Sequence, residues 1–328
     1  PLFPRCYTAA AASDGEALCA AAAAPSTLVN VTVAANTAGS GAGGGLLLEG
    51  GVSLEIVGGS LRDNSAATEG GGARLRPAEG SAAAYAPALL VVGASVVGNA
   101  AAAGGGLFAT ESYLNMSGGE WARNVANLAE ISDCEDVDVG TGAALYLERC
   151  AAALSGIAID ANVAARGGGA LFSLGVVAGR PPPPPLAAMG LAAATTIKGC
   201  DLTANVAQYG GALMLRGGAT EVSDSTFDAN GGPCTGDGGG GGAACAAVAG
   251  GALFCSDGAT VALRDAAFVR NAALLGGAMS VGSADDGAAA GGCTVDASAL
   301  TCAANRAPPH PLRSHGGGCA FVTAGSSV

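Results

Sequence analysis

Asparagine recurs along this chain in a constant local register, nine times, each time after a short apolar segment. The residue three positions before each asparagine is apolar in every case, and so is the residue eight positions before it. Successive asparagines are 25 to 43 residues apart. A repeat of this period is typical of solenoid proteins, and it constrains the fold more than any other feature. The nine residues are Asn36, Asn64, Asn99, Asn124, Asn162, Asn205, Asn230, Asn271 and Asn305.

The residues between these positions alternate in polarity, as in Glu221-Val222-Ser223. A period of two is typical of β-strands. Glycine pairs follow several asparagines and precede another apolar strand, as in Gly168–Leu171 and Gly250–Leu253. Glycine permits positive φ, so these pairs are expected at the corners between strands. The pattern predicts an all-β fold, a right-handed parallel β-helix of about nine coils.

Stacking of the coils would place each asparagine directly above its equivalent in the next coil. We expect the amides to form a hydrogen-bonded ladder and the asparagines themselves to adopt the left-handed conformation. The β-helix is predicted over residues 28–328, after a cap or lead-in over 1–27. The longer spacings predict loop insertions near 126–140, 175–194, 231–249, 283–292 and 306–315, and another at 77–86.

The composition excludes several classes of protein and partner. Glycine supplies 56 of the 328 residues, which disfavours a helical domain because glycine costs about 1 kcal/mol per helical position. The net charge is −12 and Lys198 is the only lysine, so neither nucleic acid nor an acidic membrane surface is expected as a partner. The uncharged stretch 82–110 contains Pro87 and three consecutive glycines, which argues against a membrane span.

Eleven cysteines without a CxxC pair fit no zinc template and indicate an oxidising compartment. We expect disulfide bonds Cys6–Cys19 in the N-terminal cap and Cys234–Cys245 across a glycine-rich loop, and a further bridge from Cys134 to Cys150. The sequence alone leaves the connectivity open. The chain begins at Pro1 without a methionine, which suggests a processed product or a piece of a longer protein.

Two N-glycosylation sequons, at Asn30 and Asn115, agree with an extracellular or cell-surface location. A proline run lies inside a predicted loop and offers a second kind of glycosylation site after hydroxylation. Its members are Pro181, Pro182, Pro183, Pro184 and Pro185.

The repeat motifs resemble those of a known family. Gly-Gly-Ala-Leu at 168–171, 210–213 and 250–253, with Phe-x-x-Asn at 227–230 and 268–271, is similar to the GGA[ILV] and FxxN repeats of chlamydial polymorphic outer-membrane proteins. That resemblance implies a pectin-lyase-like β-helix and a surface-displayed adhesin. The proline run also resembles the hydroxyproline-rich segments of green-algal wall and ciliary-surface glycoproteins.

One acidic cluster is a candidate calcium site, because alternating carboxylates in a loop can supply the six to eight oxygen ligands that Ca²⁺ prefers. The alternative is a solvated acidic loop held by Cys134. The cluster contains Asp133, Glu135, Asp136 and Asp138. His310 and His315 are expected to be loop residues and not a metal pair. No other cofactor is expected.

The favoured function is a structural or adhesive module that binds other surface or matrix proteins, glycans, or further copies in a filament. The alternative is a polysaccharide lyase or glycoside hydrolase of the same fold. Hydrolysis of this kind needs two nearby carboxylates. Asp160 and Asp228 share the position two before the asparagine, but Thr203 of the intervening coil separates them. Asp201 and Asp265 lie at other offsets, so catalysis is not expected.

Overall fold

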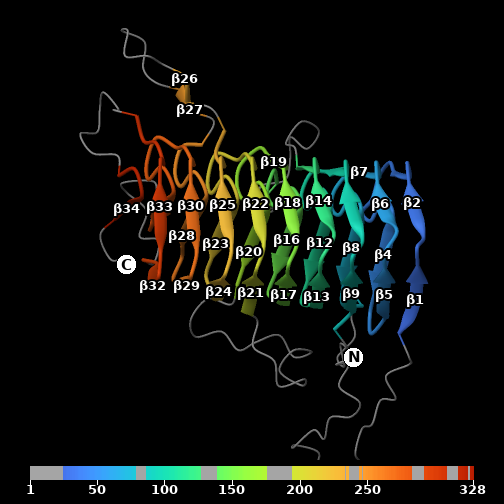
Figure 1. Ribbon diagram of the computed structural model, residues 1–328. Helices are drawn as coiled ribbons and strands as arrows, with labels where there is room; N and C mark the ends of the chain where they lie inside the picture. The colour runs from blue at the N-terminus through green and yellow to red at the C-terminus, as the bar shows by residue number, and fades with distance from the viewer. Residues whose placement is uncertain are drawn as a thin grey trace, which may run out of the picture.

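The computed structural model describes residues 25–78, 86–126, 139–175, 194–232, 247–282, 292–308, 317–323 and 326–328, and the backbone of 234–235 and 244–245. The predicted all-β class is confirmed: the chain forms a right-handed parallel β-helix, and no α-helix occurs in the described residues. Figure 1 shows the coils stacked in chain order, from β1 (blue) at one end to β32, β33 and β34 (red) at the other.

Each coil contributes one strand to each of three nine-stranded parallel sheets. Sheet A contains β1 (Ser26–Val29), β5 (Ser53–Val57), β9 (Ala88–Val92), β13 (Tyr113–Ser117), β17 (Ala151–Ser155), β21 (Ala194–Lys198), β24 (Ala219–Ser223), β29 (Thr260–Arg264) and β32 (Thr294–Ser298). Sheet B contains β2 (Thr32–Ala34), β6 (Ser60–Arg62), β10 (Ser95–Val97), β14 (Glu120–Ala122), β18 (Ala158–Asp160), β22 (Asp201–Thr203), β25 (Thr226–Asp228), β30 (Ala267–Val269) and β33 (Thr301–Ala303).

The third long sheet, sheet D, contains β4 (Leu46–Glu49), β8 (Ala73–Arg76), β12 (Leu107–Thr110), β16 (Leu145–Glu148), β20 (Leu171–Leu174), β23 (Leu213–Arg216), β28 (Leu253–Ser256), β31 (Met279–Val281) and β34 (Ala320–Val322). A short sheet C follows the asparagines, with β3 (Thr37–Ala38), β7 (Ser65–Ala66), β11 (Ala100–Ala101), β15 (Val125–Ala126) and β19 (Val163–Ala164). A separate antiparallel pair consists of β26 (Cys234–Thr235) and β27 (Ala244–Cys245).

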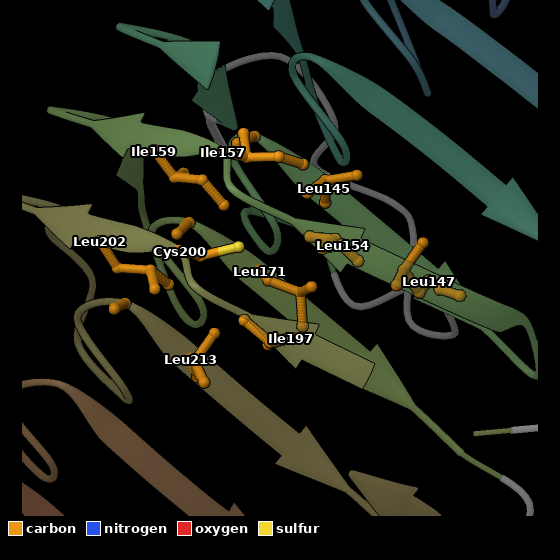
Figure 2. Packing of buried hydrophobic residues seen from close by; sticks show 14 of the residues in the cluster. Leu145, Leu147, Leu154, Ile157, Ile159, Leu171, Ile197, Cys200, Leu202 and Leu213 are labelled. Carbon is orange, nitrogen blue, oxygen red and sulfur yellow. The ribbon is translucent and has the colours of Figure 1, made fainter. Parts of the chain in front are cut away.

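The two apolar columns inferred from the sequence lie in register in the structure. Residues eight before the asparagine pair along sheet A, as Met116 pairs with Leu154, and residues three before it pair along sheet B, as Phe227 pairs with Phe268. Both columns are buried in the seven inner coils. Figure 2 shows the inner side chains of adjoining coils meeting between the sheets, with Cys200 among them. The core is therefore a stack of thin layers, each shared with its neighbours.

The asparagines form a continuous ladder through the core. In each of the first eight coils the backbone N–H and the side-chain amide of the asparagine donate to Oδ1 of the next asparagine, as Asn205 does to Asn230 at 3.0 and 3.1 Å. The second amide hydrogen bonds a carbonyl of the preceding coil, as Asn205 Nδ2 bonds Ile159 O at 2.9 Å. The side-chain amide of every inner asparagine is thus paired, which offsets the cost of burying it.

The left-handed conformation lies one residue earlier than predicted. The residue before each asparagine has positive φ, including Ala161 at 53° and Arg270 at 54°, whereas no ladder asparagine does. The prediction for the asparagines was wrong, because the residue before each of them makes the left-handed turn and the asparagine itself follows it. A second position with positive φ lies six residues before each asparagine, and glycine occupies it in five coils.

The glycine pairs serve two different purposes. The first glycine of each pair has positive φ, as Gly210 does at 58°, and turns the chain into sheet D. The second has an ordinary φ, but a side chain there would overlap the backbone of the next coil, as at Gly211 against Gly251. The predicted corner therefore explains only the first glycine, and close stacking of the backbones explains the second.

A row of apolar side chains on the outer face of sheet D is also buried. Phe108 stacks on Tyr146 with ring centroids 4.2 Å apart, and Tyr146 lies 4.8 Å from Phe172. The row extends toward the C-terminal coil through Met214 and Phe254. Because these rings are at most 5% exposed, they form a second apolar cluster outside the main core and not an open surface.

The internal segments that the structure does not describe interrupt the repeat at two equivalent positions. Residues 127–138 and 309–316 follow the asparagine, as the antiparallel pair β26–β27 also does. Residues 79–85, 176–193 and 283–291 fall between sheet D and sheet A. The strands on either side keep the coil register, so insertions at these places do not interrupt the stack.

Candidate functional site

The outer face of sheet A is hollowed at its C-terminal end, over strands β21, β24, β29 and β32. The hollow has a volume of about 340 Å³ and is open to solvent. Its floor consists of outward residues at matching positions, where small side chains such as Ala219 and Ala262 leave space. Side chains that can hydrogen-bond line it as well: Thr196, Thr260, Thr294, Glu221 and Asp296.

Two carboxylates lie in the same column of this hollow. Glu221 and Asp296 are both nine residues before their asparagines and flank Ala262. Two strand spacings separate their backbones by about 9.6 Å. Asp296 Oδ2 accepts a hydrogen bond of 2.5 Å from Arg264 Nη2, so the two side chains form an ion pair. Lys198 lies in the same column as Arg264, two strands away.

The carboxylates weighed from the sequence do not form a catalytic pair. The register is Asp160–Thr203–Asp228 along sheet B, as expected, so a threonine separates the two aspartates. Asp228 also accepts hydrogen bonds from Nε and Nη2 of Arg270, and this pairing raises the pKa of Arg270. Asp265 lies at a left-handed corner with φ of 50°. The column containing Glu221 was missed, although its constant offset of nine could have revealed it.

The candidate calcium cluster Asp133, Glu135, Asp136 and Asp138 lies outside the described residues, so the calcium site stays a prediction. His310 and His315, expected to be loop residues and not a metal pair, also lie outside them. Within the described ranges, no three histidine, cysteine or acidic side chains come together as metal ligands.

The two sequons differ in their surroundings. Asn30 is exposed at a left-handed corner of the first coil. Asn115 lies in the middle of β13, half-buried between Leu90 and Ala153 of the neighbouring strands. Glycosylation at both sites stays a prediction, and the run Pro181–Pro185 lies outside the described residues.

Two disulfide bonds join cysteines that the sequence left unassigned, Cys255 to Cys293 and Cys302 to Cys319. The second bridges two adjacent core positions, which Phe268 and Ala278 occupy in the preceding coil. Both disulfides lie at the C-terminal end, where the last coil has no described neighbour on one side of its core. Alignment of the coils places both members of the second pair in inward columns, but it does not show which inward columns meet across the core.

The predicted bridge from Cys134 to Cys150 is wrong, because Cys150 has a buried free thiol. Its Sγ contacts the carbonyl of Glu148, as the Ser112 hydroxyl contacts Thr110 one coil earlier, so the cysteine takes the place of a corner serine. Burial raises the pKa of Cys150 to about 12. Cys200 is a second buried free thiol, whose pKa burial also raises.

The remaining predicted disulfide bonds involve side chains that lie outside the part of the chain described by the structure. Cys6 and Cys19 lie there, and so do the side chains of Cys234 and Cys245. The backbone places Cys234 directly opposite Cys245 in the β26–β27 pair. That register is the one a bridge between them would need.

Comparisons with known proteins leave the function open. No protein-family model, curated protein sequence or solved structure matches this chain. No helix among the described residues is long and apolar enough to span a membrane.

Proposed function

We propose that this chain is a structural or adhesive module of an extracellular surface, matrix or filament glycoprotein, without catalytic activity. The observation that carries the proposal is the asparagine ladder. It continues unbroken through all nine coils, with every inner amide paired and at most 1% exposed. Such a stack resists local distortion, because displacing one coil leaves buried donors and acceptors unpaired on both sides.

The cysteines support the extracellular part of this proposal. Two disulfides persist most readily in an oxidising compartment. The exposed sequon at Asn30 and the proline run agree with a secreted glycoprotein. The resemblance to surface-displayed adhesins rests on the Gly-Gly-Ala and Phe-x-x-Asn repeats and points the same way.

The outer faces of the β-helix are better suited to binding a partner than to catalysis. A solenoid presents long, regular surfaces, and insertions at its corners are the usual carriers of recognition. The hollow on sheet A is shallow, and its threonines and small residues can contact a glycan or an extended peptide. One of its two carboxylates, Asp296, is held by Arg264, which does not favour it as the second carboxylate that hydrolysis requires.

A polysaccharide panel tests this choice against the enzyme alternative. The full-length protein, with and without added Ca²⁺, is incubated with uronate-containing and neutral polysaccharides. We expect no release of reducing or unsaturated ends above the blank. Release that Glu221→Gln abolishes and Glu120→Gln, on sheet B, leaves unchanged would establish the enzyme and overturn the proposal.

Location is tested separately on the source cells. Antibodies against this chain should label intact, unpermeabilised cells or their surrounding matrix. Labelling that appears only after permeabilisation would overturn the extracellular assignment.

A further inference from the structure

The outer face of sheet A has two chemically different halves. From β21 to β32 its outward side chains are small, polar or charged, and they surround the hollow. Nearer the N-terminus, large side chains with apolar surface lie on the same face, at Val57, Leu90, Val92 and Tyr113. We refer to these four residues as the apolar patch. Val92 is 37% exposed and the other three are half-buried, so the patch contacts solvent.

Asn115 adjoins the apolar patch on two sides. Tyr113 precedes it by two residues on β13, so both side chains point to the outer face of the strand. Leu90 lies directly beside Asn115 on β9, and Val92 lies beside Ser117. On the other side, β17 places only alanines next to Tyr113 and Asn115, which leaves room above the sheet.

The side-chain amide of Asn115 differs from those of the ladder. Asparagine is disfavoured in strands, and the ladder asparagines compensate by bonding successive coils, as Asn162 bonds Asn205. Nδ2 of Asn115 donates no hydrogen bond to a described residue and is not buried. Asn115 is also the acceptor of a glycosylation sequon, which Ser117 completes on the same face of β13. The nitrogen that receives a sugar in such a sequon is therefore accessible here.

We propose that Asn115 carries an N-linked glycan that covers the apolar patch, with its first sugar packed against the ring of Tyr113. One face of an N-acetylglucosamine ring consists of C–H groups, which pack favourably on the electron-rich face of an aromatic ring. Two residues of a strand place Tyr113 and Asn115 about 6.6 Å apart, within the reach of a sugar bound to Nδ2. The glycan shields apolar surface that a soluble protein otherwise leaves exposed.

Attachment joins Nδ2 of Asn115 to C1 of the first sugar. The donor is an oligosaccharide linked to a lipid diphosphate, and the bond from C1 to its phosphate oxygen breaks. The lipid diphosphate leaves with the bonding electrons, and Nδ2 releases one proton to a basic group of the oligosaccharide transferase. The transfer takes place on the extended chain before the coils stack, so the later position of Asn115 in a strand does not prevent it.

The glycan restricts where sheet A can bind a partner. The hollow begins at β21, two strands from β13, and only small outward residues of β17 lie between them. Binding through sheet A is then confined to the half that contains Glu221 and the threonines. The inference rests on the extracellular part of the proposed function, because N-glycans are added in the secretory pathway.

Occupancy of the two sequons is measured on the full chain secreted from a eukaryotic host. Enzymatic release of N-glycans converts each occupied asparagine to aspartate, so peptide mass mapping reports on each site separately. We expect Asn115 to be occupied in most molecules and Ser117→Ala to abolish its glycan. Thr32→Val is the matched control, because it removes only the sequon of Asn30. Secreted protein in which Asn115 is unmodified would overturn the inference.

Amide hydrogen exchange tests whether the glycan lies on the patch. In Ser117→Ala, exchange in β9 and β13 should be roughly two- to tenfold faster than in the parent chain, the range expected for an aromatic contact. Thr32→Val should leave exchange in both strands unchanged. In a Tyr113→Thr background, adding Ser117→Ala should change the exchange rates by less than about twofold. An undiminished effect without Tyr113, or no effect in its presence, would contradict packing of the sugar on the ring.

Two further variants separate loss of the glycan from a direct effect of the change at Ser117. Ser117→Thr keeps the sequon, so it should be glycosylated and exchange like the parent chain. Asn115→Gln removes the glycan and keeps Ser117, and it should show the same acceleration as Ser117→Ala. Parent-like exchange in unglycosylated Asn115→Gln would overturn the inference even if Ser117→Ala fails to fold.

The inference and the proposed function fail separately. A glycan on Asn30 but not on Asn115 would leave the extracellular module intact and remove only the cover of the patch. Cleavage of polysaccharide would overturn the proposed absence of catalysis without affecting the glycan.

Discussion

The backbone N–H and the side-chain amide of Asn124 both donate to Oδ1 of Asn162, at 2.9 and 3.0 Å. Asn162 in turn donates to Trp121 O at 2.8 Å and to Oδ1 of Asn205 at 3.0 Å. One side chain therefore joins three successive coils in the buried interior. Each inner asparagine therefore satisfies buried hydrogen-bonding groups in the coils on both sides.

Asn162→Ala should lower the free energy of unfolding by at least about 3 kcal/mol, because it leaves several buried polar groups unpaired, each costing roughly 1–3 kcal/mol. Denaturant unfolding followed by circular dichroism measures the loss. Asn305→Ala is the matched control in the last coil, where water can replace the amide, and should cost less than half as much. Equal losses at the two positions would show that the buried ladder is not the source of stability.

Ala161→Gly should stabilise the protein by about 0.5–1 kcal/mol. Ala161 has a φ of 53°, a conformation that costs a residue with a Cβ roughly 1–2 kcal/mol, while the flexibility of glycine in the unfolded chain offsets part of the gain. The control is Ala164→Gly, three residues later in β19, where the alanine is buried in ordinary strand geometry. That change should destabilise by about 1 kcal/mol, and a stabilising effect there would contradict the explanation.

The buried thiol of Cys150 should make stability depend on alkaline pH. Its folded pKa of about 12 lies above the ordinary value of 9.0, so the unfolded state releases its proton first. The free energy of unfolding should therefore be unaffected below about pH 9 and fall as the pH rises toward 12. Denaturant unfolding at a series of pH values measures the fall.

Cys150→Ser provides the control for that titration. The serine reproduces the corner hydrogen bond that Ser112 makes one coil earlier, at 2.7 Å to Thr110 O. The variant should fold with a change of less than about 1.5 kcal/mol at pH 7 and show a smaller alkaline fall than the parent. An identical alkaline fall in both proteins would assign the effect to other groups.

Breaking the Cys302–Cys319 bridge should loosen the last coil and leave the middle of the β-helix unchanged. The two residues are 17 apart in sequence, for which the loss of the crosslink costs about 3 kcal/mol. In Cys302→Ala/Cys319→Ala, amide hydrogen exchange should accelerate in β33 and β34 and not in β14 or β18. Uniform acceleration would mean that the whole stack opens as one unit.

The repeat predicted the positions of the inward columns because stacking at one strand spacing forces equivalent residues into contact. Met116 and Leu154 could therefore be paired from their offset alone. The glycine corners and the asparagine ladder followed from the same register. Side-chain chemistry identified the asparagine as the ladder residue, but it could not locate the strained backbone one residue earlier.

The disulfide pairs were not predicted, because bonding depends on which columns face each other across the core. Cys302 and Cys319 lie in different sheets, and only the closed cross-section brings them together. The hollow around Glu221 could not be predicted either, because it forms only where small outward residues of four stacked coils lie side by side.

The sequence by itself determined the strand period, the coil register and the ladder, because these are properties of equivalent positions along one chain. The tertiary structure alone decided which columns meet across the core and where positive φ is placed. It also decided the direction in which the asparagine ladder donates its hydrogen bonds. These depend on the closure of each coil and the direction of its hydrogen bonds, which a one-dimensional pattern does not contain.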